Sequence, residues 1–176
     1  MLALIFGLIL IPFLVFFWLV GNRSFVPAVV ASSNGAHYGI NLPKGFSPAH
    51  FNDTLPEMSL QYENKDRDLH VLVIDDSKAK IISFGLDYDL ETYMKIATRI
   101  LDQDGVYANK SLVINGNKAI QTEIKVNQKT KKKIYLLTCI ETTKYFYQLL
   151  VWSGEEKYDS NKADMEMIVN SFKEME

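Results

Sequence analysis

The sequence predicts an α+β fold in which an antiparallel β-sheet of about six strands is flanked by helices on both faces, preceded by an N-terminal transmembrane helix. Three features predict this. The first 20 residues contain no charged side chain. Much of the remaining chain consists of short runs rich in β-branched and aromatic residues, separated by polar turns. Two longer segments place apolar residues at the spacing of an amphipathic helix.

The first segment, residues 1–20, is apolar throughout. A helix of this length rises about 30 Å, which matches the hydrocarbon core of a bilayer. Aromatic residues gather near its end, as they do at membrane interfaces. The residues expected to mark this membrane segment are Met1, Phe13, Phe16, Trp18 and Val20.

A permanent signal anchor is the favoured interpretation of this segment. A cleavable signal peptide needs a basic region before an apolar stretch of about 7–15 residues. No basic residue precedes this run, although Val29-Val30-Ala31 could serve as a cleavage site. A buried core helix is disfavoured because such helices seldom have so long an unbroken apolar run. Arg23, which follows the segment, weakly favours a cytoplasmic domain.

The chain after the membrane segment divides into a tether and one domain. Residues 21–35 contain mainly Asn, Ser, Pro, Ala, Val and Gly with no strand or helix period, which predicts a short tether. Residues 36–176 are enough for a single domain with a core. The 19 basic and 21 acidic residues nearly cancel, which argues against nucleic-acid binding. Cys139 is the only cysteine and lies in an alternating run, so we expect a small buried side chain without a disulfide.

Several runs have the composition and alternation of strands. They are residues 37–42, 59–63, 69–75, 111–114, 119–127, 134–141 and 144–152. Asn115-Gly116 joins two of them and suits a type I′ hairpin turn. The runs 69–75, 134–141 and 144–152 carry apolar residues on both faces. Strands covered on both faces require helices on both sides of the sheet.

Two helices are predicted. Residues 87–103 have a helical apolar period, with Asp89 placed as the N-cap and Gly105 beyond the end. Residues 163–175 form the second, after a polar loop over 153–160. The side chains expected to face inward from it are Met165, Ile168, Val169 and Phe172.

No catalytic or metal-binding motif is present in the sequence. The three histidines are dispersed, and no two of them share a helical face. The run Asp102–Gly105 resembles the start of a calcium loop, but its twelfth position is Val113 where a Glu is required. An enzyme would have to combine distant groups, of which His70 and Asp75 are the candidates.

One basic run is the first candidate contact site. Its residues are Lys129, Lys131, Lys132 and Lys133. Such a cluster could touch anionic lipid or an acidic partner. The favoured alternative is a solvated hairpin tip, because a turn between two strands is expected to be polar.

Aromatic residues near the end of the chain are the second candidate site. Tyr145 and Tyr147 should share one strand face, and Phe146 and Gln148 the other. Both faces are interpreted as core, and a buried Gln148 must find a hydrogen-bond partner. The alternative is an apolar ligand pocket, whose candidate lining residues are Tyr145, Tyr147, Gln148 and Phe172.

The order of these elements resembles the PsbP-like superfamily, which includes the extrinsic photosystem II protein and the bacterial DcrB-like proteins. The resemblance runs from about residue 38 to 173 and rests on the segments YGINLPKGF, VINGNKAIQTEIKV, KYFYQLLVWSG and MIVNSFK. It implies an α/β/α sandwich around an antiparallel sheet that is typically non-enzymatic. It also implies that bacterial members are often exported or tethered, which favours an extracytoplasmic domain.

Two functions are consistent with these features. The first is a membrane-tethered, non-catalytic module that binds or scaffolds another envelope protein. The alternative is a carrier or sensor of a small apolar ligand, held between the sheet and the C-terminal helix. Neither requires a cofactor or nucleic acid. An extracytoplasmic, membrane-anchored location is expected, with secretion after signal cleavage or a cytoplasmic-facing domain as alternatives.

Overall fold

The computed structural model describes residues 24–51, 58–102, 105–128 and 131–175. The predicted membrane segment, residues 1–20, lies outside these ranges, as does Lys129. No helix within the described ranges is long and apolar enough to cross a bilayer.

The described chain forms two antiparallel sheets, a larger one of seven strands and a smaller one of three. In spatial order, the larger sheet contains β3 (Ser47–Pro48), β4 (Met58–Asn64), β5 (Leu69–Ser77), β9 (Tyr145–Gly154), β8 (Lys131–Glu141), β7 (Asn117–Gln128) and β6 (Lys110–Ile114). The smaller sheet contains β1 (Phe25–Ala31), β2 (His37–Pro43) and β10 (Lys173–Glu174). The helices are α2 (Lys78–Ser83), α3 (Leu90–Leu101) and α4 (Glu155–Asn170).

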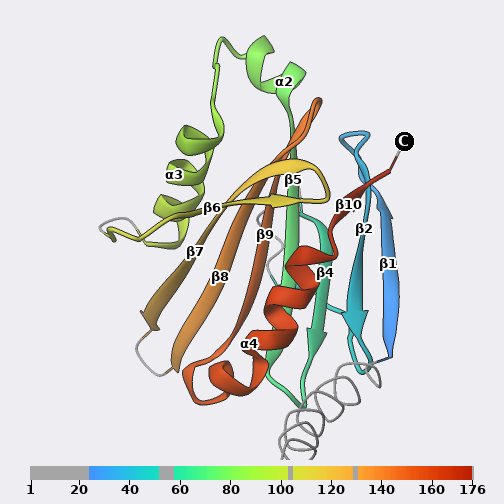
Figure 1. Ribbon diagram of the computed structural model, residues 1–176, viewed down its shortest axis with the longest axis vertical. Coiled ribbons are helices and arrows are strands. Elements are labelled where there is room, and N and C mark those ends of the chain that lie inside the picture. Colours follow the sequence, from blue (N-terminus) through green and yellow to red (C-terminus); the bar gives the residue numbers. More distant parts are fainter. Residues whose placement is uncertain (1–23, 52–57, 103–104, 129–130, 176) are drawn as a thin grey trace, which may run out of the picture.

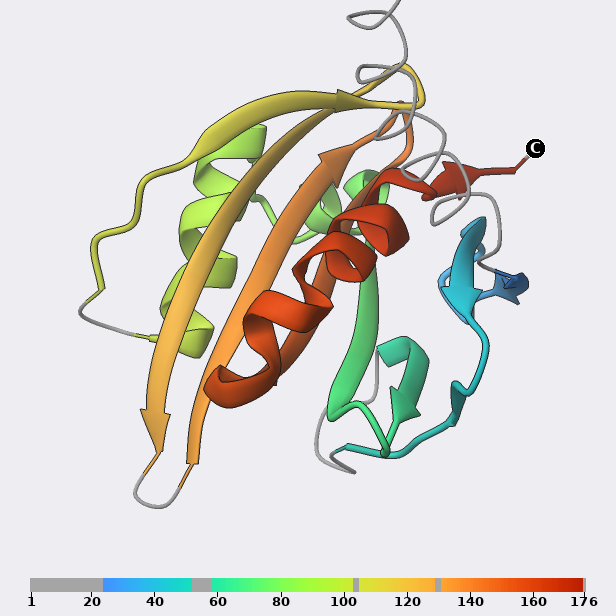
Figure 2. The ribbon, with the colours of Figure 1, turned by 60° about the horizontal axis from the view of Figure 1, so that its bottom comes forward.

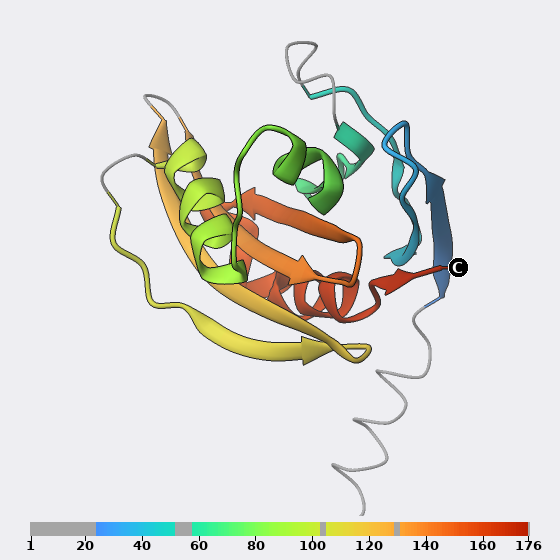
Figure 3. The same cartoon turned by 90° about the horizontal axis from the view of Figure 1, so that it is seen from above.

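Helices cover both faces of the larger sheet, which confirms the predicted layering (Figure 3). On one face, Met165 and Ile168 of α4 pack with Val71 and Leu149 in a core that includes the smaller sheet. On the other face, α3 packs against a second core; its members include Leu72, Tyr93, Met94, Leu150 and Trp152. Alternate residues of β5 and β9 therefore enter different cores, because side chains alternate across a strand.

The predicted hairpins and the first predicted helix are confirmed. β6 pairs with β7 through Asn115 and Gly116, whose φ angles of 48° and 86° are those of a type I′ turn. β4 pairs with β5 as expected. Asp89 caps α3 by accepting a hydrogen bond of 2.7 Å from the backbone N–H of Thr92. That cap satisfies one of the donors left free at a helix start.

The prediction of an irregular tether over residues 21–35 is wrong for 25–31, which form β1. Within the described ranges β1 pairs with β2 alone, so it is an edge strand whose side chains are mostly exposed. One face packs on the core through Ala28 and Val30, but the run is apolar at every position and so shows no alternation. The strand period was therefore missing from the sequence.

Pro27 lies on the free edge of β1. The N–H of Asn41, its partner in β2, donates to Ser171 Oγ at 2.8 Å and so faces away from β1. In an antiparallel pair the backbone groups of opposite residues face the same way, toward or away from the partner strand. The nitrogen of Pro27 therefore faces outward, where another strand would need an N–H. A proline at this position therefore hinders the addition of a further strand to the edge.

The second helix differs from its prediction at both ends. α4 begins at Glu155, inside the expected polar loop 153–160, and ends at Asn170. Phe172, expected on the helix, follows it and is fully buried. The early turns of α4 are polar even on their inner face, where Asn161 and Asp164 are buried. This is why the apolar period pointed to a later start.

The two ends of the molecule are built from different connections (Figure 1). At the lower end of Figure 1, which we call the tether end, β1 begins, β4 turns into β5 and β9 leads into α4. β7 ends and β8 begins there as well. At the opposite end, which we call the far end, β5 leads into α2 and β8 turns into β9. Figure 2 shows the smaller sheet beside the larger one, with α4 on the face turned toward the viewer.

Candidate functional site

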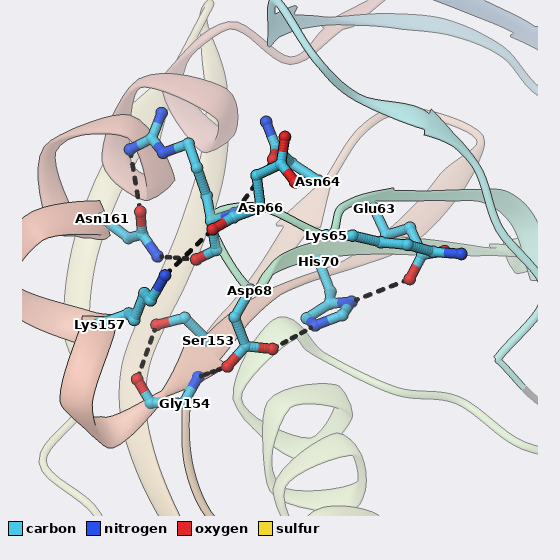
Figure 4. Close-up of polar contacts among 11 residues, drawn as sticks. Glu63, Asn64, Lys65, Asp66, Asp68, His70, Ser153, Gly154, Lys157 and Asn161 are labelled. Atoms are coloured by element: carbon cyan, nitrogen blue, oxygen red, sulfur yellow. Dashed lines mark hydrogen bonds and ion pairs between the residues drawn. The ribbon is translucent and has the colours of Figure 1, made fainter.

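A polar cluster at the tether end joins the β4–β5 turn to the start of α4 (Figure 4). Asp68 has a φ of 49° and stands at its centre. One carboxylate oxygen accepts the N–H of Gly154 at 3.0 Å, and the other lies 3.0 Å from Nε2 of His70. A Cβ on Gly154 would lie 2.6 Å from Asp68 Oδ2, so a larger residue there would displace the Asp68 carboxylate.

Arg67 extends the same cluster onto α4. Its guanidinium pairs with the buried carboxylate of Asp164 and donates to Asn161 Oδ1 at 2.9 Å. Asn161 in turn donates from Nδ2 to the backbone oxygen of Arg67 at 2.9 Å. Lys157 Nζ adds a bond of 3.0 Å to the backbone oxygen of Asp66. These contacts fix the turn on the helix, which is a structural role.

His70 is held in an aromatic stack on the α3 face of the sheet. Its ring stacks on Trp152 at 5.0 Å between centroids, and Phe51 meets both rings edge-on. Nδ1 of His70 lies 3.8 Å from Glu63. Asp75 belongs to the opposite face, since it is an odd number of residues from His70 along β5. The sheet therefore separates the two groups named for an enzyme. Within the described ranges, no group of three or more His, Cys, Asp or Glu is arranged to hold a metal.

Asp75 instead fastens the smaller sheet to the larger one. It is fully buried, its Oδ2 accepts a hydrogen bond of 2.7 Å from Ser32, and its backbone oxygen accepts one of 2.9 Å from Asn34. Both partners belong to the β1–β2 turn. Burial, with a contribution from the Asp75 charge, raises the pKa of Tyr38 well above its usual value. Tyr38 thus stays neutral and shares a 2.5 Å hydrogen bond with Ser59.

The four residues proposed to line a ligand pocket do not face one space. Tyr147 and Phe172 pack together on the α4 side with ring centroids 4.8 Å apart, and Tyr145 is next to Tyr147 on that side. Gln148 faces α3, where its Nε2 donates to the hydroxyl of Tyr93 at 3.0 Å. The expectation that a buried Gln148 finds a partner is confirmed.

The described part of the lysine run, from Lys131 to Lys133, lies where the hairpin prediction placed it, at the tether end of β8. Lys132 and Lys133 belong to β8, opposite Asn127 and Val126 of β7. Lys132 is two-thirds exposed and lies 3.5 Å from Glu155. Lys131 starts the strand, although only its backbone is described.

An apolar projection at the far end was missed by the sequence reasoning. Ile82, Phe84 and Leu86 expose 61%, 71% and 44% of their surface. They lie on and just after α2, a six-residue helix none of whose residues is buried. Gly85, with φ of 75°, turns the chain between the last two. The sequence feature that could have indicated this projection is the run IISFGL, residues 81–86, which lies between two charged segments. This run has neither the alternation of a strand nor the length of a core helix.

Similar proteins are found among solved structures by comparison of the fold, but none by comparison of the sequence. No family model and no curated protein matches the chain. The cyanobacterial PsbP protein CyanoP of Synechocystis sp. PCC 6803 aligns with a TM-score of 0.61 at 14% identity, over 89% of this chain and 95% of that one. LpqN of Mycobacterium tuberculosis, described as involved in cell envelope biogenesis, aligns with a TM-score of 0.58 at 10% identity, over 88% and 94%.

A third structure, from Bacteroides thetaiotaomicron, aligns with a TM-score of 0.54 at 8% identity, over 79% of this chain but 45% of its own. All three identities are too low to carry more than architecture. The chain therefore has the PsbP-like fold.

Proposed function

We propose that the chain is a membrane-tethered, non-catalytic module that binds another protein of the cell envelope through its far end. The observation that carries the proposal is the apolar projection of Ile82, Phe84 and Leu86. The two cores already enclose most of the large hydrophobic residues described, so these three are not needed to complete the domain. Clustered exposed apolar side chains are typical of protein-binding or membrane-binding surfaces.

The position of the projection favours a protein over the tethering membrane. The apolar segment 1–20 is followed by only four residues, 21–24, before β1 begins at the tether end. Four extended residues span at most about 14 Å. The strands that separate the two ends are longer; the 12 residues of β7 alone extend roughly 36 Å. A domain so tethered holds its tether end near the bilayer and its far end away from it.

The proposed location is extracytoplasmic. LpqN, which shares the fold, is described as involved in cell envelope biogenesis, and this supports an envelope role here. The alternative of an apolar ligand carrier is less well supported. Its candidate lining residues lie on two faces of the sheet, and Tyr147 and Phe172 are packed against each other.

The proposal is tested by crosslinking in the producing cells. A photoreactive amino acid replaces Phe84 in the full-length chain, and a matched chain carries it at Val113, which is 70% exposed on β6. We expect one defined protein adduct from position 84 and none from position 113. The adduct should disappear when Ile82→Ser is added. The same adducts from both positions, or an adduct indifferent to Ile82→Ser, would contradict the proposal.

A further inference from the structure

We infer that the tip of the β7–β8 hairpin rests on anionic lipid headgroups, through Lys125, Lys132 and Lys133, when the chain is tethered. This inference depends on the membrane-tether part of the proposed function and is independent of the far-end partner. It assigns a binding partner to these three lysines, whose side chains belong to neither core.

The first argument is position. β7 runs toward the tether end and β8 returns from it, so these three lysines lie at the same end as the start of β1 (Figure 1). Residues 21–24 are all that separates β1 from the apolar segment. Their reach of about 14 Å keeps this end of the domain close to the bilayer surface. The Debye length at 0.1 M salt is about 10 Å, so lysines on this end lie within or near the range of the surface charge.

The second argument is local charge. From Lys125 to Ile134 the sequence contains no carboxylate. Lys125 and Lys132 are 69% and 66% exposed. They share one carboxylate, Glu155, at 3.6 and 3.5 Å, which leaves the tip with an excess of positive charge. Clusters of basic side chains beside a membrane segment are attracted to anionic lipid.

Several other carboxylates at this end are paired within the protein. Glu63 lies 3.2 Å from Lys65, and Asp164 is paired with Arg67. Asp68 contacts His70 and the N–H of Gly154. Glu123, on β7, is paired with Lys162. Asp66, Glu156 and Asp159 are exposed, and lie on the β4–β5 turn and the first two turns of α4 rather than on the β7–β8 hairpin. The hairpin tip is thus the basic part of the tether end.

The experiment uses the full-length chain in vesicles of phosphatidylcholine, with or without about one-third phosphatidylglycerol. Flotation first shows that the chain is inserted. Amine acylation, followed by mass spectrometry, then gives the reaction rate of each lysine. Lys118 and Lys144 are the internal controls, because they are exposed and lie at the far ends of β7 and of the β8–β9 pair.

We expect phosphatidylglycerol to slow acylation of Lys125 and Lys132 at least threefold and to leave Lys118 and Lys144 unchanged. Addition of 0.5 M salt should remove the difference, because exposed charges are screened at that ionic strength. The double variant Lys125→Gln/Lys132→Gln should lose the protection of Lys133, and the matched double variant Lys118→Gln/Lys144→Gln should keep it.

Three results would overturn the inference. Equal rates in both lipids would show that the tip does not touch headgroups. Equal slowing of acylation for the lysines at both ends would show that the domain lies flat on the membrane or binds it in no fixed orientation. Chains that fail to float would contradict the tether itself, and with it the proposed function, whereas flotation without protection contradicts this inference alone.

Discussion

The two ends of the domain differ in how their side chains are used. At the tether end, Arg67, Asp68 and Asn161 bond the β4–β5 turn to α4, so the charged groups hold separate elements together. At the far end, α2 has no buried residue and presents apolar side chains to solvent. The comparison teaches that polar residues at one end join elements of the fold, while apolar residues at the other end lie outside both cores.

The largest contrast should come from two isoleucines. Ile168 is fully buried under the sheet and Ile82 is 61% exposed at the far end. We expect Ile168→Ala to lower the free energy of unfolding by about 2–5 kcal/mol, the range for a buried large-to-small change. Ile82→Ala should change it by less than about 0.5 kcal/mol. Urea unfolding measures both, and similar losses would show that α2 is part of the core.

The next contrast lies within the tether end. Arg67→Ala leaves the carboxylate of Asp164, which is 4% exposed, without its guanidinium partner. We expect the free energy of unfolding to fall by about 3 kcal/mol, because removing one partner of a buried ion pair leaves the other charge buried without compensation. Lys65→Ala removes a lysine that is 79% exposed and should cost less than about 1 kcal/mol. Equal melting temperatures for the two variants would contradict the assigned role of the turn.

Thiol reactivity compares the buried core with the exposed far end. Burial, helped by the Asp76 charge, raises the pKa of Cys139 far above its usual value, so little reactive thiolate forms. The native chain should react with a thiol reagent at pH 8 only when it unfolds. An Ile82→Cys variant should react at least 100-fold faster at its new thiol, as followed by mass. Rapid modification of Cys139 would mean that the core opens locally.

Acid should weaken one contact between the sheet and α4. Glu123 accepts a 2.7 Å hydrogen bond from Lys162. Partial burial acts to raise the pKa of Glu123, but the favourable contacts, led by the Lys162 hydrogen bond, together outweigh it and the pKa lies below its usual value. A lowered folded-state pKa gives stability that is present above about pH 4.5 and is lost as pH falls further. Glu123→Gln should therefore lose less stability than the natural chain between pH 5 and pH 3, as measured by unfolding.

The smallest expected effect on stability concerns the free edge of β1. Pro27→Thr restores an outward N–H without removing a bond to β2, so the melting temperature should stay nearly unchanged. Self-association should increase, because an unblunted edge can pair with a second copy. Sedimentation velocity at rising concentration checks this. A variant that stays as monomeric as the natural chain would show that the edge is protected in another way.

The sequence predicted those elements in which the spacing of apolar residues follows the buried faces. β5 and β9 alternate between two apolar cores, and α3 has a capped, amphipathic sequence, so their types and faces were predictable. The start of α4 was not, because Asn161 and Asp164 face inward to meet Arg67, about 95 residues away in sequence. Long-range polar partners leave no periodic signal, and a strand that is apolar at every position, such as β1, leaves none either.

The candidate sites were predictable to different degrees. The lysine run was visible as a charge cluster, and its place at a hairpin tip followed from the strand pattern. The far-end projection could not be predicted, because an exposed apolar run has the same residue composition as a buried one. Only the fold shows that Ile82, Phe84 and Leu86 have no core to enter.

The smaller sheet has a mechanical consequence. β1 pairs antiparallel with β2 over seven positions, from Phe25 opposite Pro43 to Ala31 opposite His37. In the proposed tethered domain, Phe25 would be the residue of β1 nearest the bilayer. A pull between the membrane and a partner at the far end would act along β1 and load its ladder of bonds in shear, all at once. A force at right angles to the strands would instead open the pair from one end and break these bonds one by one. The geometry therefore suits a domain that must keep its shape while under tension.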